Sequence, residues 1–174
     1  MKRALTAAAV VLALGAAGGG CGCGGPPRPS YPREPVRVVL PAIDGGNVDF
    51  ASLRGTPVAV QFFTTWSVAA MSDVEELRRA REKTGGRLEI VSVGLDPNGA
   101  VLIFPWRDEV RADWWVATST PETIAGTLFG QIEFIPTTFV LDAAGRIVWR
   151  HEGQLPPGRL AGVVQSLVRQ GGAP

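Results

Sequence analysis

The sequence predicts an α/β fold, and three observations lead to this prediction. Val58 to Phe63 is a short run of apolar and β-favouring residues that passes within a few residues into a helical pattern. Leu88 to Gly94 is a second apolar run of strand length, and it follows that helix. Near the C-terminus a single apolar stripe recurs at helical spacing, formed by Leu160, Val163, Val164, Leu167 and Val168. Strands that alternate with amphipathic helices are typical of a sheet covered by helices.

The N-terminus has the features of a signal peptide. Residues 2–3 are basic, and residues 4–17 form an apolar run that is too short to span a bilayer. Three glycines then precede Cys21, and this pattern resembles a bacterial lipoprotein signal, in which the cysteine becomes the lipid-carrying N-terminus. Because Gly18 stands where such signals usually have leucine, cleavage after Ala17 by an ordinary signal peptidase is the alternative.

The composition indicates one globular domain behind an extended leader. Hydrophobic residues make up 45% of the chain and charged residues 19%, which excludes a disordered chain. We expect a signal peptide over 1–20, a Gly/Pro-rich tether over 21–35, and the domain over 36–172. The prolines of the tether exclude regular structure, so it is either a semi-stiff spacer or a leader without function. Two short strands, Val36–Leu40 and Val48–Phe50, are predicted to form a hairpin at the start of the domain.

The elements between the strands are predicted from spacing and capping signals. Ser67 to Thr84 reads as a helix, with apolar residues at helical spacing that are Val68, Met71, Val74 and Leu77. The strand that follows, Leu88–Gly94, is expected to lie parallel to the first one. The last predicted strand, Arg146–His151, precedes the final helix.

Three further segments lie between these elements. Ala100–Val110 is predicted as a helix in which Pro105 either introduces a kink or marks the true start. Trp114 and Trp115 point to opposite faces if the segment is extended, so one can be buried and the other exposed. A capping hydroxyl followed by Pro121 predicts a helix that runs to about Phe129.

Three stretches of the sequence resemble the thioredoxin superfamily, in particular the membrane-anchored thiol-disulfide oxidoreductases of the TlpA/ResA type. They are the strand and turn that end in Thr64-Thr65-Trp66-Ser67, the hairpin followed by Leu53-Arg54-Gly55, and the run Ile135-Pro136-Thr137-Thr138-Phe139. The resemblance covers about residues 36–170. It implies a thioredoxin-like fold with a central mixed β-sheet flanked by helices and an N-terminal β-hairpin extension.

The chain departs from this family at the catalytic residues. The family carries Trp-Cys-x-x-Cys, and alignment on Trp66 places the two cysteine positions at Ser67 and Ala70. Thiol-disulfide exchange needs one thiolate to attack a disulfide and a second thiol to resolve the mixed disulfide. A hydroxyl and a methyl group can do neither, so we expect no catalytic residue at these positions.

The resemblance also implies a peptide-binding groove. In the family the proline that matches Pro136 is cis, and the backbone of the preceding residue pairs with an extended substrate segment; a trans proline at a strand entrance is the alternative. The expected groove residues are Trp66, Ser67, Ile135, Pro136 and Thr137.

Other kinds of chemistry find little support. Ser67 is expected to cap its helix, because a hydrolytic serine needs a base and the single histidine, His151, is predicted on a distant strand. One histidine leaves no metal site, and the copper-delivery relatives of this fold use two cysteines that are absent here. Gln61 is an amide where many thioredoxins carry a buried acid. A net charge of +1 gives no reason to expect nucleic acid, and no cofactor is expected.

The sequence leaves three functional hypotheses. The first is a protein of the bacterial cell envelope, periplasmic or extracytoplasmic and lipid-anchored at Cys21, that is redox-inactive and binds an extended peptide or an envelope protein. The second is an oxidoreductase that uses Cys21 and Cys23 or a partner's thiols, although a Cys-x-Cys disulfide closes a strained ring. The third is a structural part of a larger envelope complex.

Overall fold

The computed structural model describes residues 31–126 and 128–171. The signal peptide and most of the predicted tether, with Cys21 and Cys23, lie outside the described residues. Within them the elements follow the order β1 (Val39–Pro41), β2 (Asn47–Asp49), β3 (Val58–Phe63), α1 (Val68–Lys83), β4 (Glu89–Gly94), α2 (Ala100–Val110), β5 (Trp115–Thr118), α3 (Pro121–Ile124), β6 (Thr137–Leu141), β7 (Ile147–Glu152) and α4 (Arg159–Gly171).

The central sheet has five strands in the order β5-β4-β3-β6-β7. β3 is parallel to β4 and β4 to β5, whereas β6 runs antiparallel to both β3 and β7, so the sheet is mixed as predicted. β1 and β2 form a separate two-stranded hairpin. The hairpin joins the sheet at β5 through a bridge between Ala42 and Ala117.

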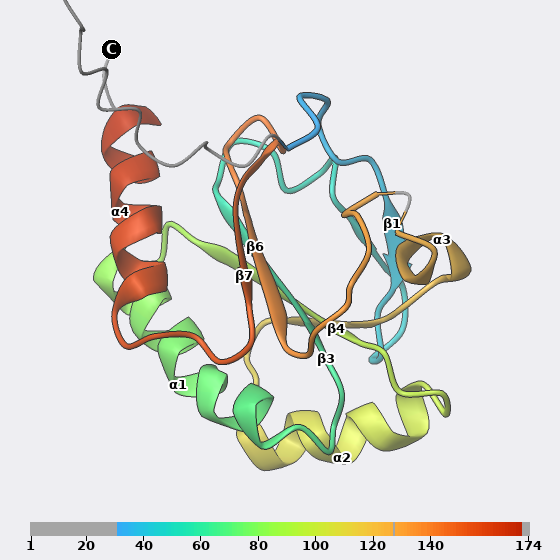
Figure 1. Cartoon of the computed structure of the whole chain (residues 1–174). Helices are drawn as coiled ribbons and strands as arrows, with labels where there is room; N and C mark the ends of the chain where they lie inside the picture. The colour runs from blue at the N-terminus through green and yellow to red at the C-terminus, as the bar shows by residue number, and fades with distance from the viewer. Residues whose placement is uncertain (1–30, 127, 172–174) are drawn as a thin grey trace, which may run out of the picture. The chain divides into compact units, whose positions relative to one another are not determined.

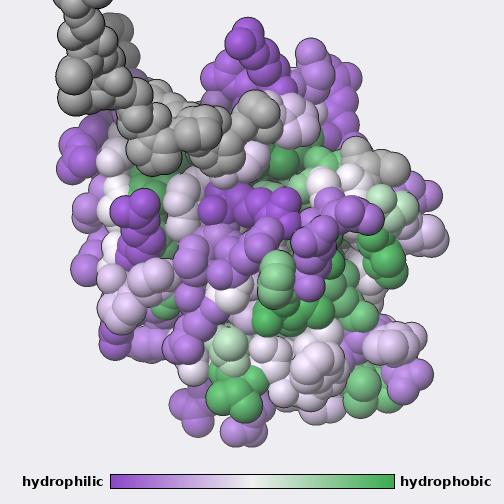
Figure 2. Space-filling view, in the orientation of Figure 1, coloured by the Kyte–Doolittle hydropathy of each residue, from purple (hydrophilic) through white to green (hydrophobic). Residues whose placement is uncertain are grey.

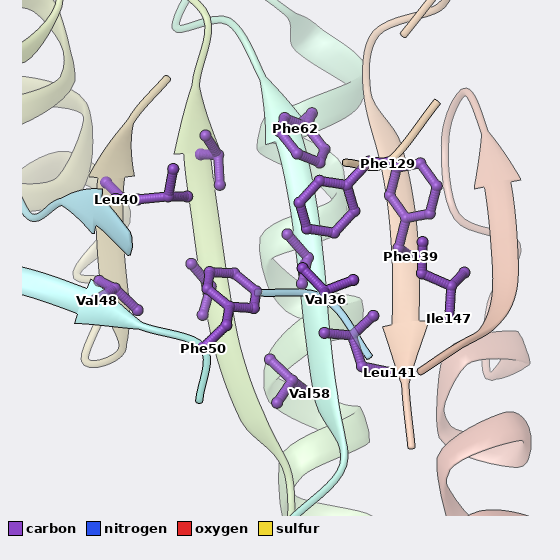
Figure 3. Close-up of a cluster of buried hydrophobic side chains, with 14 of the residues drawn as sticks. Val36, Leu40, Val48, Phe50, Val58, Phe62, Phe129, Phe139, Leu141 and Ile147 are labelled. Carbon is purple, nitrogen blue, oxygen red and sulfur yellow. The ribbon is translucent and has the colours of Figure 1, made fainter. Parts of the chain in front are cut away.

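Helices and the hairpin cover the two faces of the sheet. α1 and α4 lie on one face, and β1 and α3 lie on the other (Figure 1). The α1–α4 face is apolar, with Ala59, Leu77, Ile90, Val140 and Leu160 among its fully buried residues. On the other face the rings of Phe50, Phe62, Phe129 and Phe139 meet beside the hairpin (Figure 3).

The predicted third helix is shorter than the sequence suggests. It ends at Ile124 instead of running to about Phe129, and the glycine at position 126 explains why. Gly126 has a φ of +74°, and a Cβ there would lie 2.9 Å from the amide nitrogen of Gln131. The chain therefore turns sharply, and Phe129 packs into the core with its ring centroid 5.0 Å from that of Phe62.

The buried face of α1 also differs from the predicted stripe. Val74 and Leu77 are buried, but Val68 is 80% exposed and Met71 is 39% exposed. Ala70 and Ala80 are buried instead, together with two carboxylates. Helical spacing predicts which residues share a face of the helix. It does not predict that the first turn of α1, with Val68 and Met71, extends past the elements that pack against the rest of the helix.

The structure also shows where the helix with Pro105 begins and how far Trp114 and Trp115 are exposed. α2 begins at Ala100, so Pro105 lies inside the helix and does not mark its start. Trp114 is half-buried and its indole Nε1 donates to Ser92 Oγ at 2.9 Å, whereas Trp115 is exposed. Trp114 thus packs against the core with part of its ring, while Trp115 faces outward.

Candidate functional site

The turn between β3 and α1 is fixed by the loop that follows β4. β3 and β4 are parallel neighbours, so the segments after Phe63 and Gly94 leave the same edge of the sheet. There the Asp96 carboxylate accepts hydrogen bonds from the Thr65 amide at 3.0 Å and from the Thr65 hydroxyl at 2.7 Å. These hydrogen bonds fix the backbone of the turn at Thr65, while the next residue, Trp66, is 73% exposed. Asp96 was not identified from the sequence, because it lies 31 residues from its partner.

Ser67 starts the helix and its hydroxyl is already engaged. Its side chain accepts a hydrogen bond from the Ala70 amide at 3.2 Å, in the extended backbone conformation of an N-cap residue. The residue is only 8% exposed, and no hydrogen bond joins it to His151 within the described part of the chain. The predicted capping role is confirmed.

We expect Ser67→Ala to lower the free energy of unfolding by about 1 kcal/mol, because the Ala70 amide loses its acceptor. Urea unfolding measures this change. Ser72→Ala is the matched control, since the Ser72 hydroxyl donates to Val68 O on the exposed side of the same helix and caps nothing. Equal effects of the two substitutions would contradict the capping role.

The entrance of β6 presents backbone atoms that have no partner. The Ile135–Pro136 peptide bond is cis. Pro136 O accepts from the Gly153 amide at 2.7 Å, and Thr137 Oγ1 donates to Phe134 O at 2.6 Å, so the residues on both sides of Ile135 are held. The Ile135 N–H and C=O have no hydrogen-bond partner among the described residues. Phe134, which the sequence reasoning missed, is 56% exposed beside them.

Strand pairing brings these two segments to one edge. Phe62 of β3 pairs with Thr137 of β6, so the Trp66-Ser67 turn and the Ile135-Pro136 step both lie at this end of neighbouring strands. The structure therefore places all five predicted groove residues together. Trp66 is exposed, Ile135 is half-buried, and the other three are buried.

A buried acid lies beneath this edge, on α1 and not on β3. Asp73 is fully buried; its carboxylate accepts from Gln61 Nε2 at 3.0 Å and from the Leu155 amide at 2.8 Å. Burial raises the pKa of Asp73 to about 6; the two hydrogen bonds and His151 lower it, and the neighbouring Glu76 raises it. Gln61 Oε1 is buried and has no partner within the described residues.

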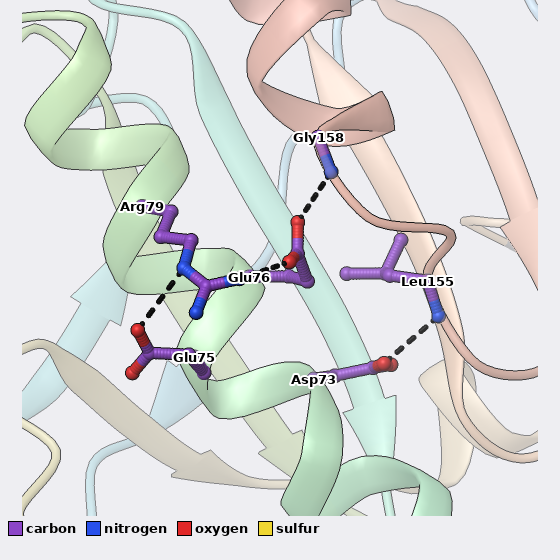
Figure 4. A network of polar contacts seen from close by, with 6 residues as sticks. All are labelled: Asp73, Glu75, Glu76, Arg79, Leu155 and Gly158. Atoms are coloured by element: carbon purple, nitrogen blue, oxygen red, sulfur yellow. Dashed lines mark hydrogen bonds and ion pairs between the residues drawn. The ribbon is translucent and has the colours of Figure 1, made fainter.

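The same helix holds the loop before α4 through a second carboxylate. Glu76 accepts from the Gly158 amide at 2.7 Å and pairs with Arg79 at 3.0 Å (Figure 4). Asp73 and Glu76 together thus anchor the segment between β7 and α4. This anchoring could not be predicted from local sequence patterns, because Asp73 and Leu155 are 82 residues apart.

Within the described residues His151 forms no hydrogen bond with the predicted groove residues, although it lies close enough to lower the pKa of Asp73. It lies on the edge strand β7, where its ring stacks on Trp149 with centroids 5.6 Å apart and its Nε2 lies 2.9 Å from Gln154 O. Among the described residues no group of three or more His, Cys, Asp or Glu side chains could hold a metal ion. Nor does that part of the chain contain a helix with the length and apolar character needed to cross a membrane.

Comparison with solved structures gives consistent matches to thiol-disulfide oxidoreductases. A thioredoxin-family thiol:disulfide interchange protein from Chlorobium tepidum has a TM-score of 0.66 and 23% identity, covering 80% of this chain and 99% of that chain. A DsbF homologue from Corynebacterium diphtheriae has a TM-score of 0.69 and 20% identity, with coverage of 78% and 87%. A secreted Mycobacterium tuberculosis disulfide oxidoreductase has a TM-score of 0.63 and 15% identity, with coverage of 75% and 96%.

At these identities the likeness establishes the fold. No protein-family model matches the chain, and no curated protein matches its sequence. The chain has the thioredoxin-like fold that the sequence predicts.

Proposed function

Because the chain has a thioredoxin fold without a cysteine at either active-site position, we propose that it is a redox-inactive binding module of the cell envelope. Its occupant is an extended segment of a peptide or protein. Residues 31–171 contain no cysteine, so no thiolate is available anywhere in the domain.

The unpaired backbone of Ile135 is the observation that carries the proposal. An extended peptide can add to a strand edge by main-chain hydrogen bonds, which give affinity without a specific side chain. Ile135 offers one donor and one acceptor, and the held neighbours Phe134 and Pro136 fix their direction. Trp66 and Phe134 are exposed aromatic residues at the same edge, and they can cover apolar side chains of the bound segment.

The proposed location rests on the N-terminal signal and on the neighbours. Residues 1–20 have the pattern of an export signal, and one structural neighbour is described as secreted. Lipidation at Cys21 would hold the domain at a membrane surface. A partner is then a protein or peptide of the same compartment.

We expect Trp66→Ala and Pro136→Ala each to weaken partner capture by at least about tenfold, because each alters a central contact of the groove. The measurement is capture from the native envelope by the purified chain, followed by titration of the recovered partner. Trp115→Ala and Pro32→Ala are matched controls, since Trp115 is exposed at the start of β5 and Pro32 is exposed beside the turn between β6 and β7. Circular dichroism verifies that each variant is folded.

Partners that are retained equally by wild type, Trp66→Ala and Pro136→Ala would show that this edge is not the binding surface. The oxidoreductase alternative has its own test, which is insulin reduction by the chain that starts at Cys21. Turnover that disappears in Cys23→Ser would favour that alternative over the binding module.

A further inference from the structure

A second surface feature lies at the other end of the sheet. A groove of about 560 Å³ is lined by apolar residues of β7 and α4, Val148, Leu167 and Val168, and by Arg87 and Arg146. A neighbouring hollow of about 410 Å³ shares Arg146 and Val148 with it and adds Tyr31 and Arg33. We call the two together the basal groove.

The basal groove and the Ile135 edge lie at opposite ends of the same strands. Val58 pairs with Leu141 at the basal end of β3, whereas Phe62 pairs with Thr137 at the other end. At about 3.3 Å per residue, the six residues of β3 separate the two ends by roughly 17 Å. A surface in contact with the basal groove therefore leaves the Ile135 edge free.

Charge in the basal groove is mainly positive. Asp142 is the one carboxylate among the described residues that line it, and it is already paired with Arg146 at 2.8 Å. Arg33 and Arg87 form no ion pair with any described residue. A groove with an apolar floor and two uncompensated guanidinium groups suits an anionic, amphiphilic ligand.

The chain enters the domain at this same groove. Tyr31 is the first described residue; it lines the basal groove and packs against the core. Cys21 lies ten residues earlier, and ten residues span at most about 36 Å, so the groove cannot lie farther than this from a lipid at Cys21. Figure 2 shows hydrophilic side chains interspersed with small apolar areas on the upper part of this face, and the largest apolar area lies lower.

We propose that the basal groove docks on anionic phospholipid headgroups of the membrane in which the chain is anchored. Arg33 and Arg87 bind the phosphates, and Val148 and Leu167 meet the glycerol and upper acyl carbons. Docking directs Trp66 and Ile135 away from the bilayer, toward a partner. This inference rests on the proposed envelope location but not on peptide binding.

The test is flotation of the chain that starts at position 21, with Cys21→Ser, on phosphatidylcholine vesicles with or without 30 mol% phosphatidylglycerol. The helices, strands and core clusters that the structure describes lie within residues 31–171, so this chain keeps every one of them. We expect binding only to the anionic vesicles, and weaker binding as salt rises. Each of Arg33→Gln and Arg87→Gln lowers the partition coefficient about fivefold, and the double variant about 25-fold.

Arg111→Gln with Arg159→Gln is the matched control, because it removes the same charge from exposed positions at the end of α2 and the start of α4. Control and wild type should float alike. Equal loss in the control and the groove variants, or equal binding to neutral vesicles, would overturn the proposal. Partner capture by the Ile135 edge is measured without vesicles, so failure of one proposal is distinguishable from failure of the other.

Discussion

The double substitution Ser67→Cys with Ala70→Cys converts the protein into a thiol-disulfide oxidoreductase. We expect insulin reduction in dithiothreitol to rise by roughly two orders of magnitude or more above the wild-type background, since serine supplies no thiolate. The first new sulfur lies at the N-terminus of α1, where the helix dipole stabilises a thiolate. Ser67 Oγ lies 3.2 Å from the Ala70 amide nitrogen, so the two new sulfurs start as neighbours, and a small local adjustment can bring them to disulfide geometry.

The second cysteine is the more demanding substitution. Ala70 is fully buried against α2, so an added sulfur must displace neighbours at a cost of about 1–3 kcal/mol. Asp73 is one turn further along the same buried face and can accept the proton of this thiol. Ser67→Cys alone is the control, because without a resolving thiol its mixed disulfide is released only by dithiothreitol from solution, so turnover should be much slower. A folded double variant with no activity would show that more than the sulfur atoms is missing.

Asp73→Asn should make the protein more stable at neutral pH but not at acidic pH. The pKa of Asp73 is raised to about 6 from an ordinary value of 3.8. Below the lower value both the folded and unfolded chains are protonated, and the carboxyl group contributes nothing. As the pH rises from about 4 to 6 the unfolded chain loses its proton first, so stability falls, and above 6 the full cost of the buried charge remains.

Between pH 4 and pH 8, the free energy of unfolding of Asp73→Asn should rise relative to that of the wild type by at most about 3 kcal/mol. Asparagine keeps an oxygen for the Leu155 amide, and Gln61 can turn so that its unpartnered Oε1 accepts from the new amide. Urea unfolding at several pH values measures the shift. Ser92→Ala, a substitution on the same buried face that does not titrate, should have an effect that is independent of pH. A constant difference for Asp73→Asn would contradict the linkage.

Local patterns in the sequence were enough to predict much of the fold and the groove. A strand that runs straight into a helix places Trp66 and Ser67 at a sheet edge, and the Ile-Pro-Thr-Thr-Phe run identifies the strand entrance at Pro136. Ser67 caps its helix because capping depends on four consecutive residues. Such features depend on neighbours in the chain, which the sequence displays directly.

Only the tertiary structure revealed the contacts between distant segments. Three such contacts join residues far apart in the sequence. They are the hydrogen bond from Leu155 to Asp73, the hydrogen bond from Thr65 to Asp96, and the packing of Phe129 against Phe62. The basal groove likewise assembles Arg33, Arg87 and Arg146 from separate loops.

The missing sulfur pair is thus a property of the sequence alone, since composition excludes a thiol from residues 31–171. What the remaining scaffold can bind is a property of the fold. Strand pairing determines which backbone groups stay without a hydrogen-bond partner, and these include the Ile135 N–H and C=O among the described residues. The contacts between loops likewise determine that Asp142 pairs with Arg146 and leaves Arg33 and Arg87 without an ion pair among the described residues.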